Sequence, residues 1–152
     1  ISYTVGWHDL TFYTLLDVNM GGNAYNQTNQ RMYQYGRSSD VDQAGKPQED
    51  KKIVDYYVNL YSANNPVDYF VEDAGFVKLR EISMRYQLPP SFSGALSKVG
   101  ASGASLSLIG RNVLTWTKYK GYDPEVGTPN VRLDSFDYPR YRTFTTSVEI
   151  NF

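Results

Sequence analysis

The side chains with the most chemical potential are closely spaced carboxylates and a single histidine. Asp40 with Asp42, and Asp123 with Glu125, have the short spacing of a weak calcium site, because calcium prefers hard oxygen ligands. Neither pair completes a calcium loop, so we expect solvated turns and predict no cofactor and no metal. His8 stands alone in a predicted tight turn, and no serine lies in a nucleophile elbow. The sequence therefore predicts that the chain is not an enzyme.

Tyrosines in two long polar stretches are the main candidates for ligand contact. Their flat rings suit the apolar faces of sugars. The same rings could equally anchor loop packing, because they bury large areas at little entropic cost. The candidates are Tyr25, Tyr33, Tyr35, Tyr56, Tyr57, Tyr61, Tyr119 and Tyr122.

Composition excludes several classes of protein. The 152 residues carry 15 basic and 16 acidic side chains, whereas a nucleic-acid surface needs a basic excess. There is no cysteine, so a disulfide framework and a thiol nucleophile are excluded. No apolar run approaches the ~18–20 residues of a spanning helix. Because Ile1 opens directly into an alternating segment, we expect no signal peptide. A membrane protein built from strands remains open.

A period of two in the apolar positions dominates the sequence and predicts an all-β chain of antiparallel strands. The predicted strands cover residues 1–7, 10–20, 76–88, 104–116 and 143–152. Residues 8–9 are short enough only for a tight hairpin, whereas residues 21–75 and 117–142 form long loops. Short helices are expected at 26–35 and 49–61. Long strands, with long loops at one end and short turns at the other, favour a transmembrane barrel.

Alternation assigns two faces to the predicted strands. The apolar parity would meet outer-membrane lipid, with Trp7, Tyr86 and Trp116 as an aromatic girdle. Lys78 and Arg80 share the parity of Ile82, so either they lie above the bilayer or a β-bulge shifts the register. The polar parity would face the barrel lumen and form cross-strand ion pairs or touch a plug: Asp17, Glu81, Arg85, Arg111 and Glu149.

The final strand closes on an aromatic residue. Phe144, Val148, Ile150 and Phe152 occupy alternate apolar positions, and we interpret them as a signal for the machinery that assembles outer-membrane barrels. The alternative is an ordinary amphipathic strand.

An isolated sheet of these strands would leave two unpaired edges, which natural proteins avoid. We therefore expect residues 1–152 to be the C-terminal segment, about five strands, of a larger barrel. Two alternatives remain open at this stage. One is a closed five-stranded soluble barrel, and the other is a soluble β-rich carbohydrate-binding module with aromatic loops.

Four motifs resemble the C-terminal region of SusC/RagA-like TonB-linked (TonB-dependent) outer-membrane transporters. Residues 72–89 read EDAGFVKLREISMRYQLP and are similar to that family's strand ending in Tyr-x-Leu-Pro. Residues 110–126 read GRNVLTWTKYKGYDPEV, the most specific match, although Arg111 stands where many members have a neutral polar residue. Residues 138–144, YPRYRTF, resemble the approach to the last strand, and residues 21–26, GGNAYN, fit a motif after an earlier strand.

The resemblance implies a 22-stranded barrel with a plug domain, located in the outer membrane of a Gram-negative bacterium. It implies import of oligosaccharides or peptides, energised through TonB, with a SusD-like surface lipoprotein as a lid. The loop tyrosines could then contact the lid instead of a substrate. A receptor that does not transport is a further alternative.

Overall fold

The computed structural model describes residues 1–62, 64–65, 67–89, 98, 100–128 and 130–152. The chain divides into two compact units. The first comprises residues 1–19, 76–116 and 140–152, and the second comprises residues 20–75 and 117–139.

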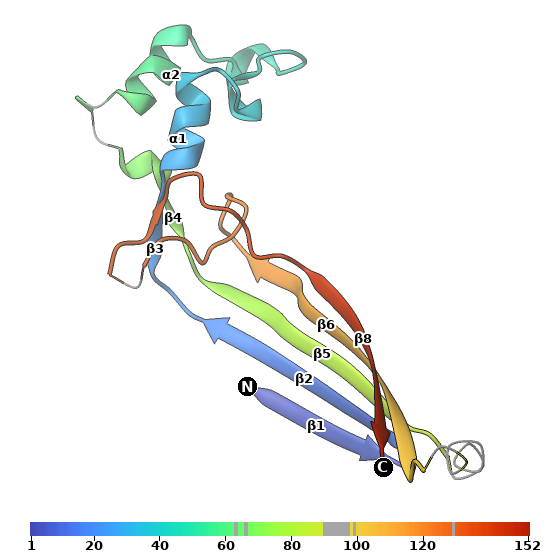
Figure 1. Ribbon diagram of the computed structural model, residues 1–152. Helices are drawn as coiled ribbons and strands as arrows, with labels where there is room; N and C mark the ends of the chain where they lie inside the picture. The colour runs from blue at the N-terminus through green and yellow to red at the C-terminus, as the bar shows by residue number, and fades with distance from the viewer. Residues whose placement is uncertain (63, 66, 90–97, 99, 129) are drawn as a thin grey trace. The chain divides into compact units, whose positions relative to one another are not determined.

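The first unit is a five-stranded sheet in the order β1-β2-β5-β6-β8 (Figure 1). The pairs β1–β2, β2–β5 and β6–β8 are antiparallel. Each of the five alternating segments lies in one of these strands, because a strict period of two leaves one apolar face per strand. The strands are β1 Ser2–Trp7, β2 Leu10–Asn19, β5 Phe76–Gln87, β6 Gly103–Thr117 and β8 Thr143–Asn151.

The β1–β2 connection is the tight hairpin that the sequence predicts. Trp7 pairs with Leu10, which leaves only His8 and Asp9 in the turn. His8 has a φ of 52°. A positive φ matches the right-handed twist of the flanking strands in a two-residue hairpin. His8 therefore has a structural role in the turn.

A β-bulge in β5 resolves the conflict between the charges and the apolar parity. Leu15 pairs with Glu81, but the next residue, Leu16, pairs with Leu79, so Arg80 is the extra residue. Past the bulge, Asp17 pairs with Lys78, which places Lys78 on the face opposite Ile82. Of the two explanations offered by the sequence, the structure has the shifted register.

The alternation predicted for β6 is interrupted once. Asn112 has a φ of 52°, a conformation that asparagine tolerates better than most residues. A Cβ atom built on Gly110 would meet Val113 Cγ2 at 3.0 Å, which strict alternation over three residues does not allow. Regular alternation along β6 is therefore broken between Gly110 and Val113.

The second unit combines a small sheet with helices. Its sheet has the order β4-β3-β7. The strands are β3 Asn23–Asn26 and β4 Val71–Asp73, both labelled in Figure 1, and β7 Leu133–Asp134. The strands among the described residues thus number eight, more than the five predicted. The helices are α1 Gln27–Gln34 and α2 Val54–Tyr61, with 3-10 turns η1 Ser39–Val41, η2 Gln48–Asp50 and η3 Asp68–Phe70.

Both predicted helices are present, with one shifted boundary. Asn26 caps α1 because its Oδ1 accepts the backbone N–H of Asn29 at 2.8 Å. The second helix starts at Val54 and not at Glu49, since Glu49 lies in η2 and Ile53 is extended. Among the described residues, no helix is long and apolar enough to cross a membrane.

The core of the second unit is small and aromatic. Phe70 is fully buried, and its ring meets the Tyr33 ring edge-on at 5.3 Å between centroids. Ala24, Ala74, Tyr119 and Val126 form a second buried cluster. The first contact lies within the loop at residues 21–75, whereas the second cluster joins the two long loops to each other.

Candidate functional site

One face of the five-stranded sheet is apolar and exposed. On this face, the strand register places Val5 beside Phe12 and Phe12 beside Met84. Toward the β8 edge of the sheet, it places Leu106 beside Val148 on the same face. A shallow groove of about 460 Å³ joins the two halves, lined by side chains that include Phe12, Met84 and Leu108. We define the apolar face as Tyr3, Val5, Trp7, Phe12, Ile82, Met84, Leu106, Leu108, Phe144, Val148 and Ile150.

The exposure of this face is unusual. Phe144 is 76% exposed and Val148 is 64% exposed, although both lie within a regular strand. Soluble monomers rarely expose contiguous apolar patches of this kind. An exposed apolar face of this kind is typical of an interaction surface.

The other face of the sheet carries charged side chains. All five side chains predicted to face the lumen form ion pairs there. Arg80 donates through Nε and Nη2 to Asp17 Oδ2, at 3.0 and 2.7 Å. Arg111 Nε lies 2.8 Å from Glu81 Oε2. We define the charged face by three ion pairs, which are these two and the pair between Arg85 and Glu149.

The third pair links β5 to β8 across β6. Arg85 Nη2 donates to Glu149 Oε2 at 2.7 Å, and Arg85 Nε donates to Ser105 Oγ at 3.1 Å. Ser105 is fully buried, so it fixes the guanidinium. The side chains predicted to lie in a lumen thus meet as cross-strand ion pairs.

The residues assigned to the girdle and to the assembly signal are mostly exposed. Trp7 and Trp116 are exposed, and Tyr86 is half-buried. Phe144, Val148 and Ile150 pair with Gly110, Leu106 and Ala104, so they share one face of β8, and the exposed Phe152 lies just beyond that strand. Their roles in a bilayer or in assembly stay predictions.

Burial corrects two of the predicted ligand contacts. Tyr33 is 3% exposed and Tyr119 is 5% exposed, so neither ring is available to a ligand. Tyr25 is half-buried, and its hydroxyl donates to Gln30. Tyr56 packs edge-on against Tyr57, with 5.2 Å between centroids. The remaining candidates are Tyr35 and Tyr122, which are largely exposed, and Tyr61, which is half-buried.

The two buried tyrosines have hydrogen bonds that hold the second unit together. Tyr33 Oη donates to Asp40 Oδ2 at 2.6 Å and lies 3.1 Å from Tyr69 Oη. Burial raises the pKa of Tyr33 far above its ordinary value, and its bonds with Asp40 and Tyr69 raise it further. Burial is also the main cause that raises the pKa of Tyr119, and the hydrogen bond to Asp134 raises it further. Both hydroxyls therefore stay protonated as donors.

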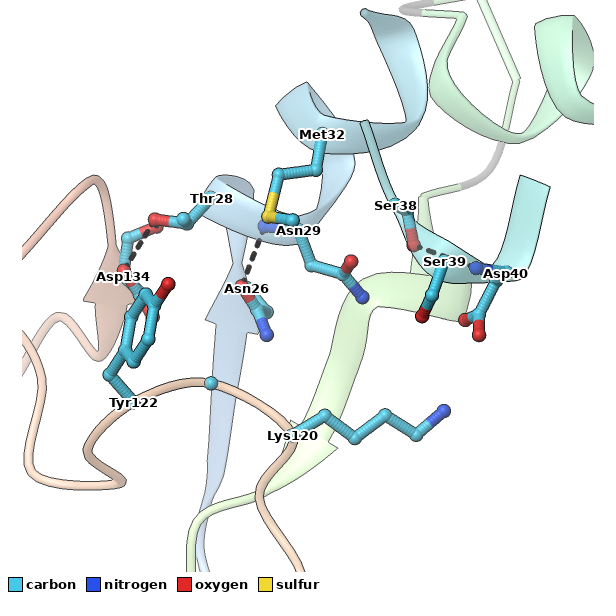
Figure 2. Close-up of a pocket in the computed structure, with 11 residues that line it drawn as sticks. Asn26, Thr28, Asn29, Met32, Ser38, Ser39, Asp40, Lys120, Tyr122 and Asp134 are labelled. Atoms are coloured by element: carbon cyan, nitrogen blue, oxygen red, sulfur yellow. Dashed lines mark hydrogen bonds between the residues drawn. The ribbon is translucent and has the colours of Figure 1, made fainter. Parts of the chain in front are cut away.

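A polar pocket of about 310 Å³ lies in the second unit (Figure 2). Its lining comes from the end of β3, α1, η1, β7 and the loop at residues 120–122. Asp134 is 4% exposed and accepts from Thr28 Oγ1 at 2.6 Å and from Tyr119 Oη at 2.7 Å. Asn26 is 1% exposed and donates to Glu72 Oε1 at 3.2 Å. The buried part of the lining is thus fully engaged in hydrogen bonds.

The rim of this pocket, unlike its buried part, carries side chains whose polar groups are mostly not bonded to other described residues of the protein. We define the rim as Asn29, Ser39, Asp40, Lys120 and Tyr122 (Figure 2). Within the part of the chain that the structure describes, the side chains of Asn29, Ser39, Lys120 and Tyr122 make no hydrogen bond to the protein. These groups are available to a ligand.

The closely spaced carboxylates have local structural partners. Asp40 accepts from Tyr33, whereas Asp42 Oδ1 accepts the Ala44 N–H at 2.9 Å. Asp123 Oδ1 accepts the Glu125 N–H at 2.9 Å, which is the hydrogen bond of an Asx turn. Among the described residues, no group of three or more metal-ligating side chains gathers.

Sequence reasoning missed most of this pocket. Asn26, Thr28 and Asp134 come together although Thr28 and Asp134 are 106 positions apart. No local pattern encodes such a contact. Asn26 did carry one usable signal, since asparagine just before a helix is a strong cap.

Comparisons with known proteins give the chain its relatives. TonB-dependent receptor P3 of Formosa agariphila is 37% identical over 92 residues, which cover 55% of this chain and 9% of that protein. TonB-dependent receptor P39 of the same organism is 33% identical over 98 residues, which cover 59% of this chain and 9% of that protein. The resemblance to TonB-dependent receptors is confirmed. No family model matches the chain.

Solved structures agree with these relatives on the fold. A structure of the RagAB peptide transporter matches 99% of this chain and 17% of its own, with a TM-score of 0.69 and 22% identity. The RagAB peptide importer in the closed-closed state matches 99% of this chain and 16% of its own, with a TM-score of 0.71 and 21% identity.

The chain thus spans about a tenth of the curated relatives that it matches and about a sixth of the solved ones. Its fold is that of a part of the RagAB peptide transporter. The relatives are named as receptors and transporters, which fits the expectation that the chain is not an enzyme.

Proposed function

We propose that this chain is the C-terminal barrel segment of a protein that imports oligosaccharides or peptides across the outer membrane of a Gram-negative bacterium. The observation that carries the proposal is the division of one sheet into an exposed apolar face and a face of cross-strand ion pairs. Transmembrane barrels alternate apolar-out and polar-in along each strand. A soluble carbohydrate-binding module would have to leave the apolar face in water.

In this proposal, the apolar face meets lipid and the charged face meets the lumen of a 22-stranded barrel. The edge strands β1 and β8 pair with further strands of the same barrel, because unpaired backbone groups are not tolerated in hydrocarbon. The apolar positions of β8 serve as the assembly signal. The second unit, built from the two long loops, lies on the extracellular side.

The proposal includes two partners. A SusD-like surface lipoprotein covers the extracellular side, and TonB supplies energy through another part of the full-length protein. The likeness in fold to the RagAB peptide transporter and the sequence similarity to TonB-dependent receptors support this choice.

A comparison of solute uptake tests the proposed function. Cells with the full-length protein and matched cells lacking it receive a mixed hydrolysate of plant polysaccharide and casein. We expect a class of oligosaccharides or peptides to disappear from the medium only when the protein is present, and a protonophore to stop that loss. Identical depletion profiles in the two strains would contradict import.

A further inference from the structure

The rim of the polar pocket offers an unusual mixture of hydrogen-bonding groups. Lys120 can only donate, the Asp40 carboxylate can only accept, and Asn29, Ser39 and Tyr122 can do both. A ligand that satisfies this rim must both donate and accept at several neighbouring points. Hydroxyl groups on a ring have that property.

The charge of the pocket indicates an electrically neutral ligand. Among its described lining residues the charged groups are Asp40, Asp134 and Lys120. The Asp134 carboxylate keeps its charge but is buried and held by Thr28 and Tyr119, so the groups that a ligand meets at the rim carry one charge of each sign. A strongly acidic or basic ligand would find no excess of opposite charge there.

An aromatic ring at the rim adds a stacking surface. Tyr122 is 80% exposed and stands at one side of the pocket, across from Ser39 and Asp40 (Figure 2). The apolar face of a pyranose can cover such a ring while its hydroxyls reach the polar groups. The volume of about 310 Å³ lies at the lower end of ligand pockets, which suits one or two sugar units.

The rim is held in place before any ligand arrives. Asp40 is fixed through its carboxylate by Tyr33 Oη, and through its carbonyl by Lys46 Nζ at 2.7 Å and Tyr57 Oη at 3.1 Å. The backbone N–H of Lys120 donates to Glu72 Oε2 at 2.8 Å. A pre-formed rim lowers the entropic cost of binding.

From these observations we infer that the pocket framed by Asn29, Asp40, Lys120 and Tyr122 is a binding subsite for a neutral saccharide unit. The inference rests on the proposed import function and assigns its ligand class at this site. A zwitterionic peptide is the competing ligand, because Asp40 and Lys120 could hold its two ends. The hydroxyl-compatible rim and the open Tyr122 ring favour the saccharide.

Binding to the purified full-length protein in detergent tests the inference. The probes are an array of neutral oligosaccharides and, separately, trialanine. Tyr122→Ala removes the ring, and Lys120→Met removes the ammonium while leaving the backbone bond to Glu72. Tyr138→Ala is the matched control, since Tyr138 is 92% exposed in the same unit and does not line the pocket.

We expect neutral oligosaccharides to bind the unchanged protein and the Tyr138→Ala variant equally. Affinity should fall about tenfold or more in Tyr122→Ala and in Lys120→Met, as expected for central contacts. The inference is wrong if no neutral oligosaccharide binds, if both variants bind as the control does, or if trialanine binding shows the same losses. Energised uptake that persists unchanged in both variants would reject the subsite and leave the import function standing.

Discussion

Among single residues, the buried Asp134 connects separate segments of the second unit through hydrogen bonds. Its carboxylate accepts from Thr28 and Tyr119, and the Thr28 hydroxyl accepts the Phe136 N–H at 2.7 Å. These bonds tie the loop at residues 117–139 to the start of α1. A buried carboxylate that loses a donor bears the cost of its own desolvation.

Replacing Tyr119 by phenylalanine tests that role. Tyr119→Phe removes one donor and should lower the free energy of unfolding of this unit by roughly 1–3 kcal/mol. Hydrogen exchange of residues 117–139 in the full-length protein measures the change. Thr11→Ser, in a strand of the first unit, is the control and should leave this exchange unchanged.

The raised pKa of Tyr119 also predicts a pH dependence. A folded-state pKa above the unfolded value of about 10 means that the folded state favours the protonated hydroxyl. The stabilisation is complete below pH ~10 and is lost as pH rises above it. Tyr33, shifted in the same direction, contributes in the same sense. The alkaline loss of protection should be smaller in Tyr119→Phe, and an unchanged slope would contradict the assignment.

A comparison of Gly127 and Gly45 distinguishes the cost of backbone strain from the cost of a steric clash. Gly127 and Gly45 have φ values of 64° and 73°, so alanine is strained at both, by roughly 1–2 kcal/mol. A Cβ on Gly127 would lie 2.2 Å from the carbonyl oxygen of Val131, whereas a Cβ on Gly45 meets nothing within 4 Å. Gly127→Ala should therefore destabilise the second unit more than Gly45→Ala in proteolysis of the native protein. Equal sensitivity would contradict the close backbone approach.

Among the elements, the ion pairs of the sheet differ in burial and so in expected strength. The Arg80 and Asp17 side chains are 18% and 43% exposed, whereas those of Arg85 and Glu149 are 48% and 56% exposed. Exposed pairs usually contribute under about 1 kcal/mol because solvent screens them. Arg80 also donates two hydrogen bonds to one carboxylate oxygen, which orders the pair.

Double-mutant cycles compare these two pairs directly. The cycle on Arg80 and Asp17 should give the larger coupling energy, and that on Arg85 and Glu149 should stay under about 1 kcal/mol. Denaturant unfolding of the full-length protein in lipid bilayers provides the free energies. A larger coupling for the exposed pair would contradict the burial seen here.

The sheet was predictable from sequence because its signal is local. Alternation over residues 10–20 and 76–88 located β2 and β5 to within a residue or so, and the misplaced parity of Lys78 and Arg80 signalled the bulge. Strands β4 and β7, three and two residues long, are too short to alternate. The pocket depends on contacts between distant segments, and the burial of Tyr33 and Tyr119 depends on packing that composition does not encode.

At the scale of the whole molecule, the proposed barrel segment requires lipid on one face of the sheet and the aqueous lumen on the other. Val148 and Ser147 are neighbours on β8, and their partners Leu106 and Ser107 are neighbours on β6. Val148 belongs to the apolar face, and Ser147 lies on the other side of the same strand. The 152 residues contain no cysteine, so a single introduced cysteine reports one position in this part of the protein.

Fluorescence quenching at these two positions tests the central claim most directly. Val148→Cys and Ser147→Cys are made in the full-length protein, labelled with one fluorophore and reconstituted in bilayers. We expect a lipid-bound nitroxide to quench the label at position 148 strongly and aqueous iodide to quench it weakly, with the reverse order at position 147. Equal quenching at the two positions, or stronger iodide quenching at position 148, would contradict a lipid-facing sheet.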